Sequence, residues 1–309
     1  MEKQKIKSKF LNIWFSIYDA CLAVYNACSL HRIRRLYPIT IMTSEETIEY
    51  IKKNNCSIAR FGDGELELML KTSSEDYQKI SDDLSEALKG VFRNTSSKLL
   101  LCMPYPMKCT KELLKHGREF WDTWALRLQK PVVTEIQKLT GEKYMFGDSF
   151  VSRPFTGYKC KSKADCLFPR LKTLWEDKDV LFVEGEGTRL GVGNDLFDNA
   201  RSIKRILAPA ENAFDAYSKI LEAVNTVWNG ELVIMALGPT ATVLASELSN
   251  KGIQALDIGH IDIQYEWYLT GEPYKPVKNK YVNESAIGKK FGECNDQQYL
   301  SQIVARVRP

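Results

Sequence analysis

The sequence predicts an α/β fold built on a largely parallel sheet. From residue 43 onward, short β-rich apolar runs alternate with segments of helical periodicity, which is the pattern of strand–helix–strand units. The run 180–184 (VLFVE) is apolar almost throughout, as in a strand that is covered on both faces. Glycine-rich and polar segments follow several of these runs, so we expect one edge of the sheet to carry a ligand site.

Each element follows from a local signal. Ser44 and the two glutamates after it predict the first turn of a helix that extends to about Lys53. Apolar β-rich runs predict strands at 57–61, 99–103, 180–184, 202–207, 232–237 and 253–258. Helical patterns predict helices at 66–70, 110–128 and 213–227 and another that opens at 238–242 and ends at 250, while 144–153 is mixed and mostly extended.

Length and composition limit the class of protein. The 309 residues suit one large domain or two small ones, and 44% hydrophobic with 27% charged residues are ordinary values for a globular protein. The formal net charge of +4 is too small to indicate a nucleic-acid partner, although it suits an anionic small molecule or an acidic membrane surface. The 8 cysteines form no C-x-x-C pair, and with only 3 histidines they indicate buried thiols of a cytoplasmic protein rather than a zinc site.

The chain divides into three parts. Residues 1–40 form a basic-flanked apolar helix, 41–270 form the α/β domain, and 271–309 form a C-terminal extension that packs on this domain or trails it.

The N-terminal part contains an apolar run at 10–30 with basic residues on both sides. The run is too long for the apolar part of a usual signal peptide, and Asp19 near its middle disfavours a membrane-spanning helix. One narrow stripe of the helix carries its polar residues, Asn12, Ser16, Asp19 and Asn26. We therefore expect an amphipathic helix that lies on the inner face of a membrane, or that packs against its own domain or a second subunit in a homodimer.

The segment Asp63-Gly64-Glu65 is the sharpest local signal. It follows the strand predicted at 57–61, and its glycine lets the backbone turn so that both carboxylates can face one cation. Carboxylate oxygens suit Mg²⁺ or Mn²⁺, ions that keep open positions for substrate phosphates. The alternative is a turn with solvated acids. The flanking Arg60 and Gly62 favour a site, and we include both in it.

A second candidate region begins at Gly238, where a predicted strand ends. The helix that follows opens with Thr240 and Thr242, whose hydroxyls, together with the backbone N–H groups of the helix end, suit a phosphate. Simple capping of the helix by threonine is the alternative. Arg153 and Arg189 lie in or beside neighbouring loops and could neutralise a diphosphate.

Further polar residues at loop positions complete the candidate site. Asn194 and Asp195 could hydrogen-bond the hydroxyls of a ribose or sugar, and Asn212 at a helix start could contact a base edge. His260 and Asp262 close the last predicted strand and share one face if the segment is extended. His260 could hold a metal or a phosphate, and Asp262 could act as a general base.

Motifs of several other enzyme classes are absent. The sequence has no G-x-x-x-x-G-K-[ST] phosphate loop, no G-x-G-x-x-G at a first strand–helix unit, no G-x-S-x-G and no H-E-x-x-H. P-loop kinases, dinucleotide-binding dehydrogenases, serine hydrolases and zinc proteases are therefore not supported.

Several of these segments, taken in order, resemble the GT-D-type glycosyltransferases, a family long catalogued only as a domain of unknown function. The resemblance covers residues 43–269, most of the chain. The matching segments are 59–65, 149–155, 191–196, 208–214, 238–242 and 259–262 with Tyr265-Glu266-Trp267.

The resemblance implies a Rossmann-like α/β domain that transfers a sugar from a nucleotide donor. In this family a D-x-E motif holds the metal and the diphosphate, and the motif maps to Asp63 and Glu65. The resemblance also implies bacterial surface glycans or glycoproteins as acceptors, with UDP-glucose as one kind of donor. We therefore expect a Mn²⁺- or Mg²⁺-dependent glycosyltransferase that works in the cytoplasm. The alternatives are a nucleotide-sugar hydrolase with the same cation site and a non-catalytic nucleotide-binding scaffold of a glycan assembly complex.

Overall fold

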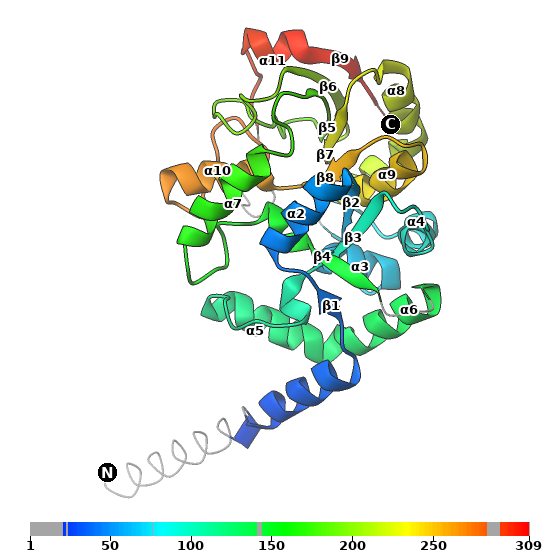
Figure 1. Cartoon of the computed structure of the whole chain (residues 1–309), viewed down its shortest axis with the longest axis vertical. Helices are drawn as coiled ribbons and strands as arrows, with labels where there is room; N and C mark the ends of the chain where they lie inside the picture. The colour runs from blue at the N-terminus through cyan, green and yellow to red at the C-terminus, as the bar shows by residue number, and fades with distance from the viewer. Residues whose placement is uncertain (1–20, 23, 76, 141–143, 283–290, 309) are drawn as a thin grey trace, which may run out of the picture.

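The computed structural model describes residues 21–22, 24–75, 77–140, 144–282 and 291–308. Within these residues, nine strands form one sheet in the order β1-β4-β3-β2-β8-β7-β5-β6-β9. Every neighbouring pair is parallel, and helices lie on both faces of the sheet (Figure 1). The expected parallel sheet flanked by helices is confirmed.

The elements have the following bounds. The strands are β1 (Thr40–Ile41), β2 (Ser57–Arg60), β3 (Leu99–Met103), β4 (Met145–Asp148), β5 (Asp179–Gly185), β6 (Ser202–Ala208), β7 (Leu232–Ala236), β8 (Ala255–Asp257) and β9 (Ile303–Arg306). The α-helices are α2 (Ser44–Asn54), α3 (Asp63–Leu70), α4 (Asp82–Phe92), α5 (Lys115–Trp124), α6 (Lys130–Thr140), α7 (Ser162–Lys172), α8 (Tyr217–Val227), α9 (Pro239–Asn250), α10 (Ile261–Thr270) and α11 (Gln297–Gln302).

Two hydrophobic cores lie on opposite faces of the sheet. Successive strand residues alternate between them, so that Leu100 and Phe182 enter one core while Leu101 and Val183 enter the other. Helices α2, α7 and α10 cover the first core, and α4, α6, α8 and α9 cover the second. Because both faces are covered, the central strands are mostly apolar and show no regular polar alternation, and polar residues such as Glu184 and Asp257 lie near their carboxyl ends.

The connections of the sheet open a crevice at its carboxyl edge. The chain leaves β5 towards β6 and leaves β7 towards β8, so these two neighbouring strands send their connections in opposite directions. Ligand sites of open parallel sheets form at such a point. The fold therefore predicts a site beyond the ends of β5 and β7, next to β8 and β2.

Three of the expected segments differ in the structure, and helices α4 and α7 were not expected at all. Helix α3 begins at Asp63, three residues before the predicted start, because Glu65 folds back and caps it. Helix α10 begins at Ile261, so Asp262 lies in a helix and not in an extended strand end. The single helix expected at 110–128 is instead α5, followed by a π-helical segment at Ala125–Gln129 that leads into α6.

The two ends of the chain are described only in part. Most of the apolar run at 10–30 lies outside the described residues, whereas residues 24–36 are helical and Arg34 donates a hydrogen bond to Asp122 Oδ1 of α5 at 2.9 Å. None of the helices in the described ranges has the length and apolarity that crossing a membrane requires. From residue 271 onward, the chain adds α11 and β9, and β9 pairs with β6 at the edge of the sheet.

Asp148 ties the end of β4 to neighbouring segments. Its carboxylate accepts hydrogen bonds from Ser44 Oγ at 2.6 Å, from the Phe150 backbone N–H at 2.8 Å and from the Tyr105 backbone N–H at 3.3 Å. Burial is the main cause that raises the pKa of Asp148 to about 6. Since the folded state then holds a proton that the unfolded chain has released, stability falls as the pH rises from about 4 to about 6.

We expect Asp148→Asn to increase the free energy of unfolding at pH 7 by ~1–3 kcal/mol, because an isosteric amide keeps the acceptor and removes the buried charge. The gain should shrink as the pH falls to 4, as measured by urea denaturation. Asp82→Asn is the control with the opposite trend, since its Lys71 partner lowers the pKa of this exposed carboxyl. A gain that does not depend on pH, or a loss of stability at pH 7, would contradict the account.

Candidate functional site

A cleft of about 520 Å³ opens at the carboxyl edge of the sheet. The loops that follow β2, β5, β6, β7 and β8 all contribute to it, so the expectation that glycine-rich and polar segments meet at one edge is confirmed. Their residues in the cleft wall include Gly62, Asp63, Gly64, Glu65, Gly185, Thr188, Leu190, Pro209, Ala210, Gly238, Gly259, His260 and Asp262.

The first turn of α3 brings two carboxylates to the cleft. Gly62 is the N-cap, and Asp63 and Glu65 follow in the first turn, where the positive end of the helix dipole favours acidic groups. The Gly62 backbone N–H donates to Glu65 Oε2 at 2.7 Å, so one oxygen of Glu65 is used to cap the helix. Asp63 accepts no hydrogen bond from any other described residue, and its carboxylate borders the cleft.

The charge on Glu65 is poorly compensated by the protein. Burial, followed by repulsion from the carboxylate of Asp257, raises the pKa of Glu65 to about 7. The nearby guanidinium of Arg60 acts in the opposite direction but is the weaker influence. A positive charge placed beside Glu65 would therefore stabilise the ionised form of this carboxylate.

Glu75, Tyr77 and Gln78 form a wall of the cleft that sequence reasoning missed. The ring of Tyr77 packs on Gly238, where a Cβ would lie 2.8 Å from Tyr77 Cε2. The Glu75 carboxylate packs in the same way on Gly64, where a Cβ would lie 2.8 Å from Glu75 Oε1. Both glycines therefore permit a close approach of this segment to the site. No local sequence signal pointed to this contact, because Tyr77 and Gly238 lie far apart in the chain.

Asn212 holds this wall and does not line the cleft. Its backbone N–H donates to the Tyr77 carbonyl at 2.8 Å, and its Oδ1 accepts from the Lys79 backbone N–H at 3.0 Å. The expected contact with a base edge is therefore replaced by a positioning role for the segment that carries Tyr77.

Arg60 borders the cleft as part of a buried network. Its Nη2 lies 3.1 Å from Asp257 Oδ1, its Nη1 donates to Ser152 Oγ at 2.7 Å, and a Cβ on Gly259 would collide with its guanidinium. Arg153, directly after this network, and His260, the N-cap of α10, also line the cleft. Arg153 lies close enough to Tyr77 to lower its pKa, against the larger upward influence of burial.

Thr240 and Thr242 are buried in α9 and do not line the cleft. Thr242 Oγ1 donates to the Arg60 carbonyl at 2.8 Å and to Asp257 Oδ2 at 3.2 Å, so it supports the buried network. Thr240 Oγ1 is buried without a partner among the described residues. These hydroxyls therefore do not face the cleft, although this was expected for a phosphate site. Of residues 238–242, only Gly238 lines the cleft.

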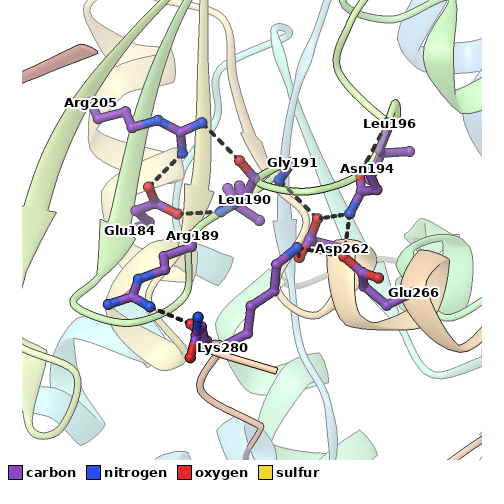
Figure 2. A network of polar contacts seen from close by, with 11 residues as sticks. Glu184, Arg189, Leu190, Gly191, Asn194, Leu196, Arg205, Asp262, Glu266 and Lys280 are labelled. Atoms are coloured by element: carbon purple, nitrogen blue, oxygen red, sulfur yellow. Dashed lines mark hydrogen bonds and ion pairs between the residues drawn. The ribbon is translucent and has the colours of Figure 1, made fainter. Parts of the chain in front are cut away.

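Asp262 lines the cleft but is held by three donors (Figure 2). Its Oδ1 accepts from the Gly191 backbone N–H at 2.8 Å and from Asn194 Nδ2 at 2.9 Å, and its Oδ2 pairs with Lys280 Nζ at 2.7 Å. Asn194 also donates to Glu266 Oε1 at 2.7 Å, so its amide is used within this network and not in the cleft. The expected general base is thus a buried, ion-paired group that positions the glycine-rich loop.

Arg189 and Asp195, unlike Asp262, do not line the cleft. Arg189 donates to the carbonyls of Asn279 and Gly292, so it holds the C-terminal segment against the loop. Asp195 pairs with Lys172 Nζ at 2.7 Å on the other side of the loop. Neither side chain is available in this arrangement to neutralise a diphosphate or to bind a sugar hydroxyl in the cleft.

Asp63 and Glu65 suit a divalent cation whose remaining coordination positions are filled by a bound ligand. No set of three or more His, Cys, Asp or Glu side chains in the described ranges is arranged to hold a metal. Mg²⁺ is nevertheless often held by one or two carboxylates when substrate phosphates supply further oxygens. Asp63, which accepts no described hydrogen bond, and Glu65, whose pKa is raised, form a donor set of this kind. The Mn²⁺ or Mg²⁺ ion itself stays a prediction.

Comparison with known proteins places this chain among the glycosyltransferases. The family described as the glycosyltransferase GT-D fold matches residues 58–285, which is most of the chain. The chain therefore belongs to the GT-D glycosyltransferase family, and its parallel sheet with flanking helices is the GT-D fold.

Relatives of known sequence or structure agree with this assignment. The chain is 36% identical over 275 residues to glycosyltransferase GlyD of Streptococcus pneumoniae, and 35% identical over 271 residues to the probable glycosyl transferase Gly of Streptococcus gordonii. These matches cover 87% of this chain but only 33% and 39% of the two relatives, so the chain spans between a third and two fifths of their length.

Two solved structures share the fold. A structure described as showing that the domain of unknown function 1792 has a distinct glycosyltransferase fold superposes with a TM-score of 0.83 at 36% identity and covers 90% of this chain and 99% of its own. A glycosyltransferase of the same domain from Streptococcus sanguinis has a TM-score of 0.79 at 35% identity and covers 87% of this chain and 100% of its own.

Substitution of Gly238 tests whether the close approach of Tyr77 constrains this site. Gly238 has a φ of +53°, so we expect Gly238→Ala to add backbone strain and a collision with the Tyr77 ring, for a loss of ~2–4 kcal/mol in the free energy of unfolding. Gly252→Ala is the matched control, because Gly252 has a φ of +75° but no atom within 4 Å of its Cβ position. Equal losses in the two variants, measured by urea denaturation, would show that the Tyr77 contact is unimportant.

Proposed function

We propose that this protein is a metal-dependent glycosyltransferase that transfers a sugar from a UDP-sugar, such as UDP-glucose, to a bacterial surface glycan or glycoprotein. One observation carries the proposal. Asp63 and Glu65 lie on the first turn of α3 in a cleft of about 520 Å³, at the crevice where the fold predicts a ligand, in a chain of the GT-D family. The streptococcal relatives named glycosyltransferases support the reaction class.

Each group in the cleft has a proposed task. Asp63 and Glu65 hold a divalent cation, which when bound acts as a Lewis acid on the diphosphate leaving group. Arg153 and the start of α9 at Gly238 add positive potential for the same diphosphate. His260, at the start of α10, is placed to donate a hydrogen bond to a phosphate or sugar oxygen. Electrostatic contributions of this type are each worth ~10²–10³-fold in rate.

We also propose a cytoplasmic location at the inner face of the plasma membrane, with peripheral contact through residues 10–30. The described part of this segment supports the proposal, since Leu22, Val24 and Tyr25 are 43%, 64% and 69% exposed and the basic residue Arg32 is exposed nearby. A homodimer that covers the same apolar side chains is the alternative. Liposome flotation with and without anionic lipid, combined with light scattering, distinguishes the two.

The donor can be identified by thermal denaturation with UDP, GDP, CDP and TDP, each with and without Mn²⁺. A ligand at a hundredfold excess over its Kd stabilises the folded state by ~2.7 kcal/mol, which is enough to rank the four nucleotides. We expect UDP with Mn²⁺ to give the largest shift. A UDP shift that does not depend on the metal would instead favour the nucleotide-binding scaffold.

We expect Asp63→Asn and Glu65→Gln each to reduce sugar transfer from the UDP-sugar by at least ~10²-fold, because each removes a charged metal ligand. Glu67→Gln is the matched control in the same helix, since Glu67 lies outside the cleft wall and accepts from Trp124 Nε1 at 3.0 Å, as a glutamine oxygen also can. Turnover is measured as UDP release in the presence of acceptor. Activity close to that of the wild type in both cleft variants would refute the metal assignment.

Product analysis distinguishes transfer from hydrolysis. A transferase releases UDP at a rate that depends on the acceptor, whereas a nucleotide-sugar hydrolase produces free sugar at its full rate without one. Full-rate release of free sugar in the absence of acceptor would therefore replace the proposed function with the hydrolase alternative.

A further inference from the structure

One wall of the cleft belongs to α5 and has no task in donor binding. His116, Gly117, Phe120 and Trp121 all line the cleft, and their spacing of three and four residues places them on one face of the helix. Tyr274, from the segment after α10, lines the cleft beside them. The wall is thus aromatic, in contrast to the carboxylates and glycines at the strand ends.

This aromatic wall is held in place by the surrounding fold. The Leu114 backbone N–H, at the start of α5, donates to the Gly157 carbonyl at 2.7 Å. Trp121 is buried and packs edge-on against Phe150, with ring centroids 5.8 Å apart and an interplanar angle of 66°. Because Phe150 belongs to the segment that Arg60 also contacts, the wall and the donor side of the cleft have a fixed relative position.

Two rings of this wall stay exposed although they border a cleft. Phe120 is 49% exposed and stands edge-on to Trp121, while Tyr274 is 44% exposed. The Tyr274 hydroxyl lies 3.4 Å from His116 Nε2, so a polar edge adjoins the apolar ring of Phe120. Ligand pockets typically combine apolar rings with a few convergent polar groups in this way.

We propose that Phe120, His116 and Tyr274 form the subsite for the sugar ring of the acceptor. A pyranose has an apolar face of C–H groups and a rim of hydroxyls, which suits an exposed ring next to an imidazole and a phenol. The subsite shares its cleft with Asp63 and Glu65, so an acceptor bound there would lie in the same cleft as the donor. This inference rests on the proposed function, and it adds the class of acceptor group that the cleft recognises.

Saturation-transfer NMR tests the subsite in the full chain. The probes are the methyl β-glycosides of glucose, galactose and N-acetylglucosamine, and octyl β-glucoside below its micellar concentration, each with UDP and the diamagnetic ion Mg²⁺ present. We expect at least one glycoside to show saturation of its ring protons with the wild type. Phe120→Ala should weaken its binding ~5–10-fold, and Phe120→Trp should restore it, because a ring face is what the sugar contacts. Tyr50→Ala is the control, since Tyr50 is 38% exposed on α2, outside the cleft.

This experiment distinguishes failure of the sugar subsite from failure of the proposed function. UDP signals in the same samples report the donor site, so their absence with the wild type would refute the UDP-dependent function, whatever the sugars do. The subsite is refuted if no glycoside ring binds the wild type, if Phe120→Ala leaves sugar binding unchanged, or if it weakens UDP equally. Saturation of the octyl chain in place of the sugar ring would identify a lipid as the occupant and would also overturn the inference.

Discussion

The buried ion pair between Arg60 and Asp257 is the contact on which the geometry of the cleft depends. It joins the ends of β2 and β8, the two strands at which the halves of the sheet meet, and these strands share only the register pair Ile58↔Leu256. Arg60 also donates to Ser149 O, which fixes the segment that leads to the aromatic wall. Loss of one partner of such a buried pair typically costs ~3–5 kcal/mol, because the other charge is left without compensation.

A second set of buried charges shapes the other side of the cleft. Glu184, at the end of β5, pairs with Arg205 at 2.7 Å and accepts from the Leu190 backbone N–H at 2.7 Å (Figure 2). Asp262 and Lys280 hold the next part of the same loop. The glycine-rich loop after β5 is therefore fixed by two ion pairs and by the C-terminal segment. The candidate site combines this fixed frame with Asp63 and Glu65 on α3. Nearby positive groups compensate the negative charge of Glu65 only weakly.

The strands, and the edge of the sheet at which the cleft lies, could be predicted from the sequence. The contacts of individual side chains were harder to predict. Apolar runs such as 180–184 are recognisable because strands buried on both faces have few polar positions. Several glycines together with Asp63 and Glu65 line the same cleft because the carboxyl ends of parallel strands meet at one edge. Side-chain partners were not predictable, since Asp262 and Lys280 pair through a long-range contact that no local pattern encodes. The aromatic wall was missed because the helical spacing in α5 was read only as periodicity.

The most direct test of the account is anomalous diffraction at the manganese edge from crystals grown with UDP and Mn²⁺. The account predicts an anomalous peak between the first turn of α3 and the diphosphate, about 2.0–2.3 Å from carboxylate oxygens of Asp63 and Glu65. UDP bound in the cleft with no peak there, or with manganese held elsewhere, would contradict the central claim that these two carboxylates hold the cation.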